Sequence, residues 1–394
     1  YNANIVGSNS YFYKKRKELE SLIEAHLMPT CWFTLSAADN HWNDLHKLIY
    51  EDDIKDRDTM YKDMNEKQKL SFRVRIVNDF PHIVDEYFYT RVQSFLKSFF
   101  LGRKGLTTTY YWFRVEYQER GTAHIHGCLR LESDFGISEL SQKVRNGRIA
   151  LRKLHLAGLR PRTQVPSSST CDDIFVSRFE LNKAGIAIKN NYSTEEFNEM
   201  NDVIDESLIA EKRICEYNDF LFTTFNMDPP SDSMSSDRST ATKFNQSLNN
   251  CHPCSVPVSE SILYDEVTKK QHYCDLVNTV QRHWCSAYCG GNVEGGECRF
   301  GFPLKLQEQT HMRIVEYIGN VRKKNSDGSI GARNVLRYRI ELMTKRNDRW
   351  LNSHNRKFLE SWMANMDFRL VVDIGKVMEY LTKYVTKAEK SLTR

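Results

Sequence analysis

The sequence has 394 residues, of which 40% are hydrophobic, so it is long and apolar enough to form two or three folded domains. No apolar run approaches the roughly 18 residues that a membrane-spanning helix needs, and the basic residues 14–17 do not precede an apolar stretch, so neither a membrane span nor a secretory signal is expected. The net charge of +5 is modest and unevenly spread, which makes any basic surface local.

The first part of the chain has the spacing of a helix followed by a strand. Because the sequence opens at Tyr1 rather than Met, we interpret it as a piece of a longer protein. Leu19, Leu22 and Ile23 predict a helix that ends before Pro29, and residues 31–35 predict a short strand. Further on, an apolar stripe at helical period over residues 81–100 predicts a second helix that packs against the core.

Residues 110–131 have the pattern of a β-hairpin. Apolar and polar side chains alternate up to Gln118, as in a half-buried strand, and the chain turns at Gly121. The return strand begins at His124, so Glu116, Gln118 and the following histidines can meet on one face of the hairpin.

His124 and His126 form a candidate metal site. Side chains two apart in a strand point to one face, so the two imidazoles lie side by side, and the flanking Gly121 and Gly127 leave room for a ligand to approach. Glu116 can supply the third ligand and give a His-His-carboxylate set with positions open to phosphate oxygens and water, with Gln118 as the alternative. A His-x-His pair is also common in ordinary strands, where it binds nothing.

The middle of the chain contains two polar connections and one predicted helix. Serines at residues 167–169 and the Ser/Asp-rich residues 228–247 predict mobile connections. Ser193 and Glu196 form a capping box for a helix near residues 194–220. We therefore divide the chain into an N-terminal core region over residues 1–227, a linker over 228–250, a Cys/His zinc-binding segment over 251–305, and a basic segment with a tyrosine-bearing helix over 306–394.

Ten cysteines in a chain of this length are too few for a disulfide scaffold, and six of them lie between Cys251 and Cys298. This clustering indicates metal binding in a reducing compartment. Four residues have spacing and types that suit tetrahedral structural zinc: His283, Cys285, Cys289 and Cys298. A second set, or members that exchange with the first, comprises Cys251, Cys254, His272 and Cys274. The others are interpreted as buried thiols: Cys31, Cys128, Cys171 and Cys215.

Residues 311–357 hold twelve Lys and Arg against four Asp and Glu, so the rest of the chain has a net charge of about −3. A hairpin is predicted around residues 325–328. Aromatic residues interleave with the charges, as in proteins that hold single strands by phosphate contacts and base stacking: Tyr317, Tyr338, Trp350 and Phe358. The candidate DNA-binding cations are Arg114, Arg337, Arg339, Lys345, Arg346, Arg349 and Lys387. The alternative is a solvated basic face.

Tyr380 and Tyr384 are four residues apart in a predicted final helix, so both phenols project from one face. A phenol with a pKa near 10 is a poor nucleophile at neutral pH, and the adjacent Lys383 and Lys387 favour the phenolate. These residues are therefore candidates for a paired nucleophile, the alternative being that one tyrosine packs in the core.

Taken together, these motifs resemble those of Helitron transposases, in the same order along the chain. The HUH motif of that family is resembled by residues 113–127, FRVEYQERGTAHIHG. Its early block is similar to residues 33–39, FTLSAAD, followed by His41 and Trp42, and its cysteine-containing block to residues 298–303, CRFGFP. Residues 346–348, RND, then Asn352, Asn355 and residues 362–365, WMAN, lead into residues 379–387, EYLTKYVTK, which resemble its two-tyrosine motif.

The resemblance implies an α+β fold, in which an HUH-nuclease antiparallel sheet is flanked by helices and carries a small zinc-binding cysteine-rich insertion. It implies that His124 and His126 bind Mg²⁺ or Mn²⁺, and that Tyr380 and Tyr384 cleave single-stranded DNA to give a 5′-phosphotyrosine and a free 3′-hydroxyl before rejoining. It also implies a nuclear location and a downstream helicase, although this chain has no GxxxxGK[ST] motif for ATP.

Two other interpretations remain open at this point. A plasmid relaxase or rolling-circle replication initiator shares the chemistry but lacks the cysteine block and the region around Arg346. A noncatalytic single-strand-binding zinc module would bind DNA through the basic residues 311–357 without metal and form no covalent product. The transposase interpretation accounts for the most motifs.

Overall fold

We describe the chain from a computed structural model. The described residues are 9–49, 63–101, 106–117, 121–235, 252–285, 289–290, 296–324 and 330–373. Tyr380, Lys383, Tyr384 and Lys387 lie outside them, as do Gln118 and Cys251.

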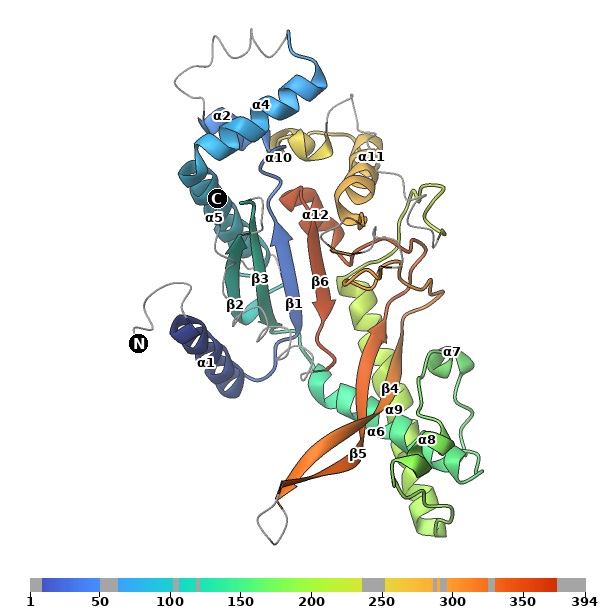
Figure 1. Cartoon of the computed structure of the whole chain (residues 1–394). Helices are drawn as coiled ribbons and strands as arrows, with labels where there is room; N and C mark the ends of the chain where they lie inside the picture. The colour runs from blue at the N-terminus through green and yellow to red at the C-terminus, as the bar shows by residue number, and fades with distance from the viewer. Residues whose placement is uncertain are drawn as a thin grey trace.

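The described residues form a central four-stranded antiparallel sheet in the order β2-β3-β1-β6 (Figure 1). Its strands are β1 (Cys31–Ser36), β2 (Thr108–Tyr117), β3 (Ala123–Leu131) and β6 (Met366–Leu370). The β2–β3 hairpin was expected from the alternation of residues 110–131, whereas β1 and β6 join it from opposite ends of the chain. Long-range packing therefore completes the sheet.

One face of the sheet is apolar. Phe33 and Leu35 of β1 are fully buried on it, and the Phe33 ring stacks on Phe368 of β6 with centroids 5.3 Å apart. Two helices cover this face, α5 (Pro81–Phe99) and α12 (Arg356–Trp362), and Phe95 of α5 meets Phe358 of α12 edge to face at 5.6 Å. Burial of these rings is the main contribution to the stability of the sheet.

The opposite face is partly covered by α1 (Asn9–His26). Leu19 of α1 packs with Cys128 and Val371, beside the indole rings of Trp32 and Trp112. This small cluster occupies one end of the face. The other end carries polar side chains and holds the candidate site described below.

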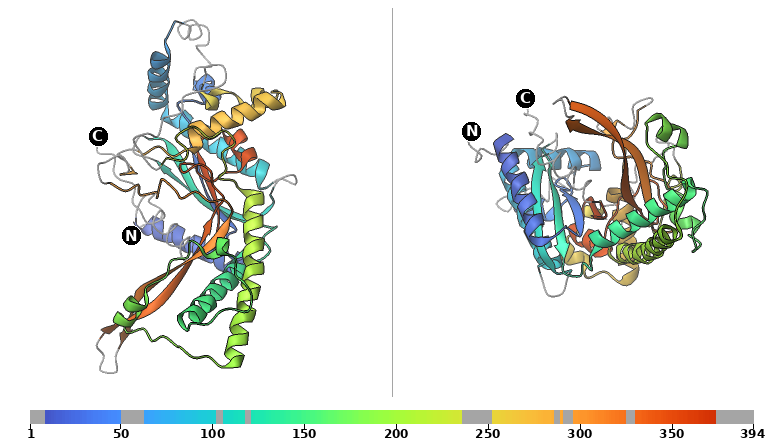
Figure 2. Two further views of the ribbon diagram at one scale, coloured as in Figure 1. Left: turned by 90° about the vertical axis from the view of Figure 1, so that its right-hand side faces the viewer. Right: turned by 90° about the horizontal axis from the view of Figure 1, so that it is seen from below.

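A long hairpin, β4 (His311–Lys324) with β5 (Ile330–Met343), extends from the β6 side of the sheet, and we call it the hairpin arm (Figure 1). Its base packs on α6 (Ile137–Leu156) and α9 (Thr194–Leu221), and it diverges from α9 toward its tip (Figure 2). Buried ion pairs fasten the arm to these helices: Arg152 Nε lies 3.1 Å from Glu316 Oε2. Arg148 of α6 similarly pairs with Glu211 of α9 at 2.8 Å.

The remaining described elements are short or peripheral. They are α2 (Asn43–Ile49), α4 (Glu66–Asp79), α7 (Ser167–Thr170), α8 (Arg178–Lys183), η3 (Pro253–Ser255), α10 (Val258–Ser261), α11 (Glu266–Leu276) and the π-helical turn η4 (Val277–Gln281). One principal core contains Phe33, Leu276 and Phe368, so the N-terminal, Cys/His-rich and C-terminal segments all contribute to it. No helix in the described part of the chain is long and apolar enough to cross a membrane.

Most of the local predictions are confirmed. The structure has the predicted opening helix and strand, the helix over residues 81–100, the hairpin over residues 110–131, and antiparallel strands on both sides of residues 325–328. The capping box of α9 is also present, since Glu196 N donates to Ser193 Oγ at 3.1 Å and Ser193 N donates to Glu196 Oε2 at 2.9 Å.

Two connections differ from expectation. Serines 167–169, predicted as a mobile connection, belong to the single helical turn α7, in which Cys171 N donates to Ser167 O at 2.8 Å. In the Ser/Asp-rich segment, Asp232 and Ser233 are buried, and Asp232 pairs with Arg282 at 2.7 Å. The remainder of that segment, residues 236–250, lies outside the described residues.

Candidate metal centre and nucleic-acid interface

The candidate metal residues lie on the polar face of the sheet. In the antiparallel register, His124 is opposite Glu116 of β2 on one side and Ser36 of β1 on the other. His126 is opposite Arg114 and Thr34 in the same way. Since directly opposite residues project to the same face, the two histidines and Glu116 share one surface, as the sequence predicted, and Arg114 lies on that surface too.

Side-chain contacts orient both imidazoles. His124 Nδ1 lies 2.9 Å from Ser36 Oγ, and His126 Nε2 lies 2.9 Å from Glu116 Oε2. The two rings meet edge to face with centroids 4.6 Å apart. Because the serine contact occupies Nδ1 of His124, Nε2 is the atom of that ring that would bind a cation.

The residue types fit a divalent cation, and the geometry fits in part. Adjacent ligands of an octahedral cation, each about 2.1 Å from it, lie about 3.0 Å apart, close to the 2.9 Å between His126 Nε2 and Glu116 Oε2. However, the donor atoms of His124, His126 and Glu116 are not among the groups of described residues that gather within 4.8 Å of one another. The structure therefore brings His126 and Glu116 together as a pair and places His124 beside them.

Gly127 has a different role from the one expected. A Cβ at this position would lie 2.6 Å from Phe33 Cζ and 2.8 Å from Trp112 O, because the residue faces the apolar side of the sheet. The glycine is needed so that the Phe33 ring can pack across β3. It does not open the histidine face to a ligand, and our sequence-based interpretation of it was wrong.

The predicted Cys/His cluster is assembled in the described residues and could hold a metal ion. The ligand atoms of His283, Cys285, Cys289 and Cys298 all lie within 4.8 Å of one another, and His283 Nε2 is 3.3 Å from Cys298 Sγ. Burial and the neighbouring thiols raise the pKa of Cys285 to about 12. Three cysteines and one histidine in this arrangement are typical ligands for tetrahedral structural zinc, and the site fits that ion.

The cluster is attached to the segment between the hairpin arm and α12. Its cysteines pack with Phe302 and with Trp350, which is almost fully buried. His283 N donates to Trp350 O at 2.7 Å, and the His283 ring stacks on Phe302 with centroids 4.5 Å apart. A metal ion bound by the cluster would order the segment that carries these cysteines against residues 344–353.

The second zinc set is not assembled by the described residues. His272 Nε2 contacts the Pro253 carbonyl at 2.9 Å, and the ligand atoms of Cys254, His272 and Cys274 do not gather within 4.8 Å. Cys251, the fourth member, lies outside the described residues.

A three-residue group that the sequence did not indicate comprises Cys171, Asp172 and His311. Cys171 is exposed, contrary to its interpretation as a buried thiol, whereas Cys31, Cys128 and Cys215 are buried. Asp172 also accepts hydrogen bonds from Lys305 and Gln307, and an ammonium in contact with this carboxylate disfavours a cation at the same place. Because His311 is far from Cys171 and Asp172 in the sequence, this group could not be predicted from a spacing motif.

The basic segment is divided between an exposed face and a buried loop. On the hairpin arm, Arg337 is exposed and lies opposite Tyr317. Its side chain packs against Gly319, where a Cβ atom would lie 2.7 Å from Arg337 Cδ. Arg339 is on the same face and pairs with Glu341 at 2.9 Å. This face therefore combines arginines with an exposed tyrosine, as single-strand binding requires.

Other members of the basic segment do not fit this surface. Trp350 and Phe358 are core residues, about 1% and 3% exposed, so neither can stack on a base, and the interpretation of these two aromatics was wrong. Arg346 is buried, Arg349 is partly buried, and Lys345 is exposed with its ammonium 5.4 Å from the Phe225 ring centroid. Lys387 lies outside the described residues.

His354 gives a pH-dependent prediction for the same region. Its ring is fully buried, with Nε2 2.8 Å from Tyr273 Oη and Nδ1 3.1 Å from Asn352 O, and burial lowers its pKa to about 4. The unfolded chain, with a histidine pKa near 6.5, takes up this proton first as the pH falls. This contribution to stability is therefore full above about pH 6.5 and is lost between pH 6.5 and 4, by about 2 kcal/mol at pH 5.

Urea unfolding at pH 7.5 and 5.0 tests this prediction, with His354→Gln as the comparison. The wild type should lose about 2 kcal/mol more than the variant over this interval. An equal loss in both proteins would show that His354 is not responsible.

The described fold is thus an α+β protein with a histidine pair and a carboxylate on an antiparallel sheet, together with a Cys₃His cluster. The model of one family, described as the Helitron helicase-like domain at the N-terminus, matches residues 1–129. This match covers about a third of the chain and includes Glu116, His124 and His126, so this segment is similar to the N-terminal domain of Helitron proteins. Neither the curated proteins nor the solved structures contain a significant match to the chain.

Proposed function

We propose that this protein is a metal-dependent single-strand DNA endonuclease and strand transferase of a rolling-circle transposon. One observation carries the proposal: His124 and His126 lie beside Glu116 on the polar face of an antiparallel sheet, inside the segment that the Helitron model matches. Two imidazoles and a carboxylate suit a divalent cation that contacts phosphate.

Tyr380 and Tyr384 are the proposed nucleophiles. The phenolate oxygen of one tyrosine attacks the scissile phosphorus, an Oη–P bond forms, and the bond from phosphorus to the 3′ oxygen breaks. The 3′ oxygen takes up a proton and leaves as a hydroxyl, while the 5′ phosphate stays on the protein. A divalent cation at the histidine site would supply Lewis-acid polarisation of the phosphate.

The other side chains of the polar face position these groups. Ser36 holds His124 by its Nδ1, and Glu116 holds His126, so the two rings keep a fixed relation to each other. Lys383 and Lys387 adjoin the tyrosines in the sequence and favour the phenolate form. No water or ATP is consumed, so the phosphotyrosine keeps the bond energy for rejoining.

Two tyrosines suit strand transfer better than degradation. One can hold a cut strand while the other attacks a second junction, or the free 3′-hydroxyl can reverse the reaction on a new target. The exposed arginines and Tyr317 of the hairpin arm would hold the single strand beside the sheet. A Cys₃His zinc site would keep the loop next to the arm ordered.

The test is incubation with labelled single-stranded DNA that spans the element's ends, with Mn²⁺ or Mg²⁺, followed by denaturing gels. We expect a metal-dependent covalent adduct that the Tyr380→Phe, Tyr384→Phe double variant does not form. The single variants identify the tyrosine that attacks first. Tyr89→Phe is the matched control, because Tyr89 is exposed on α5, away from the polar face.

Binding without any adduct on these substrates would support a noncatalytic single-strand-binding module instead. An adduct that survives in the double variant would assign the nucleophile to another residue. An adduct lost equally in Tyr89→Phe would show that the assay reports folding and not chemistry.

A further inference from the structure

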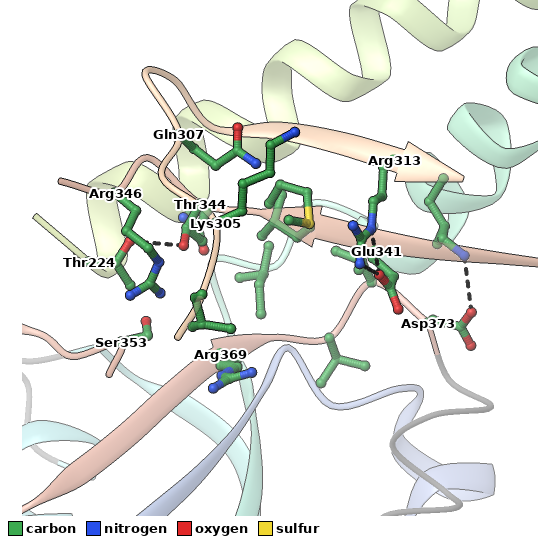
Figure 3. A pocket seen from close by; sticks show the side chains of 18 of the residues that line it. Thr224, Lys305, Gln307, Arg313, Glu341, Thr344, Arg346, Ser353, Arg369 and Asp373 are labelled. Carbon is green, nitrogen blue, oxygen red and sulfur yellow. Dashed lines mark hydrogen bonds and ion pairs between the residues drawn. The ribbon is translucent and has the colours of Figure 1, made fainter. Parts of the chain in front are cut away.

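A cavity of about 460 Å³ lies between the sheet and the base of the hairpin arm (Figure 3). Its walls come from the end of β6, from residues 340–344 of the arm, and from the loop that contains Arg346 and Ser353. Four cationic side chains line it: Lys305, Arg313, Arg346 and Arg369. Only Glu341 and Asp373 among its described lining residues are acidic, so the cavity favours an anion.

Arg346 differs from the other three cations. Lys305 pairs with Asp172, Arg313 with Glu341, and Arg369 with Asp367 at 3.0 Å. Arg346 instead donates to the carbonyl oxygens of Asp348 and Leu351. In the part of the chain that the structure describes, no carboxylate oxygen lies within 4.0 Å of its guanidinium nitrogens.

The two carboxylates that interact electrostatically with Arg346, Asp348 and Asp367, already have other partners, and Asp367 pairs with Arg369 at 3.0 Å. Asp348 Oδ2 accepts from Arg282 Nε and from Asn226 Nδ2, both at 2.9 Å. Burial lowers the pKa of Arg346 to about 10, and the neighbouring Arg369 adds to this effect. A buried guanidinium whose neighbouring carboxylates are paired with other cations is only partly compensated, and an anion in the cavity would add to that compensation.

We propose that this cavity is a phosphate subsite for single-stranded DNA, with Arg346 as its principal ligand. The DNA part of this proposal rests on the proposed function. Arg346 lies with Thr224 and Ser353 at one end of the cavity, and Arg369 approaches from β6 below it (Figure 3). Guanidinium is the cation best suited to phosphate, since it donates two parallel hydrogen bonds.

The position of the cavity favours a backbone phosphate of single-stranded DNA. Asp367, which pairs with Arg369, is in register with Thr34 of β1, and Thr34 is in register with His126 of β3. Arg369 is two residues further along the same face, about 7 Å along the strand. On the other side, Arg313 belongs to the same face of the arm as Arg337 and Arg339. A single strand of DNA that passes from the hairpin arm to the histidines would therefore cross this cavity.

The experiment measures binding of fluorescein-labelled dT20 by anisotropy over a series of salt concentrations, without added Mg²⁺ or Mn²⁺. Arg346→Gln should weaken binding about tenfold and reduce the slope of log K against log salt by about 0.7, the value for one lost phosphate contact. Arg346→Lys should restore much of the slope. Arg162→Gln is the matched control, because Arg162 is exposed and pairs with Asp202 and Asp205 away from the cavity.

A second measurement covers the case in which Arg346→Gln does not fold. At constant ionic strength, inorganic phosphate should raise the melting temperature of the wild type and compete with dT20, and Lys305→Gln should weaken both effects. Lys305 is mostly exposed, so this variant should fold. An absence of phosphate stabilisation and competition in the wild type would overturn the proposal.

These outcomes are separable from the test of the nuclease. An unchanged salt slope in folded Arg346→Gln would overturn the subsite even if the covalent adduct forms normally. A reduced slope without any adduct would support the subsite and count against the nuclease. If phosphate stabilises the protein through Arg346 but dT20 binding keeps its wild-type slope, the cavity takes a free phosphate compound, and its assignment to DNA is wrong.

Discussion

We expect His126→Ala to lower the yield of covalent protein–DNA adduct by at least about 100-fold at a fixed Mn²⁺ concentration. The reason is the position of this ring, whose Nε2 lies 2.9 Å from Glu116 Oε2 and whose centroid is 4.6 Å from that of His124. Loss of the ring removes one proposed ligand and leaves the carboxylate without its partner. The measurement is the adduct yield on denaturing gels as a function of Mn²⁺ concentration.

The matched control for this variant is His155→Ala. His155 lies in the last turn of α6, exposed and remote from the polar face, so its loss should leave adduct formation unchanged. Single-strand binding without metal should be nearly the same in both variants, because neither side chain belongs to the arm or the cavity. Equal loss of adduct in the two variants would contradict a specific role for His126.

The Glu116→Gln variant tests whether Glu116 is a metal ligand or only a hydrogen-bond partner of His126. Glutamine keeps the contact with His126 but removes the negative charge, so a true ligand position should need a higher Mn²⁺ concentration for the same yield. An unchanged metal requirement would leave Gln118 as the third ligand that the sequence also allowed.

The sequence predicted local elements well where the pattern of side chains is periodic. The alternation up to Tyr117 and the stripe that includes Phe88 and Phe95 each have one apolar face, and each formed the element expected. The paired face of Glu116 and the histidines follows from the same periodicity. These features depend on neighbours within one hairpin or helix, so no tertiary information is needed to find them.

What the sequence could not predict depends on contacts between distant segments. Trp350 looked like a stacking surface within a basic segment, but it packs on the Cys₃His cluster, which begins at His283. Arg346 looked like a surface cation, but the fold buries it, and the neighbouring Asp348 pairs with Arg282. Burial at these positions is decided by tertiary packing and not by residue type, so charge and aromatic content alone predicted the wrong environment.

Removal of the metal from the Cys₃His cluster should have the largest effect on stability. We expect the purified protein to contain about one zinc ion per chain, and Cys298→Ser to lose it together with at least about 3 kcal/mol of the free energy of unfolding. Without the ion, three buried thiols and His283 have no common partner, and the loop that carries them is held to the fold mainly through Phe302 and Trp350.

Zinc content by elemental analysis and urea unfolding measure these two effects, with Cys171→Ser as the matched control. Cys171 is exposed and outside the cluster, so its variant should keep both the zinc and the stability. The loss should also reach the proposed phosphate cavity, because Leu304 N donates to Arg349 O at 2.8 Å and His283 N donates to Trp350 O at 2.7 Å. Zinc-free protein should therefore bind dT20 with a smaller salt slope, whereas full zinc content in Cys298→Ser would show that the cluster is not the metal site.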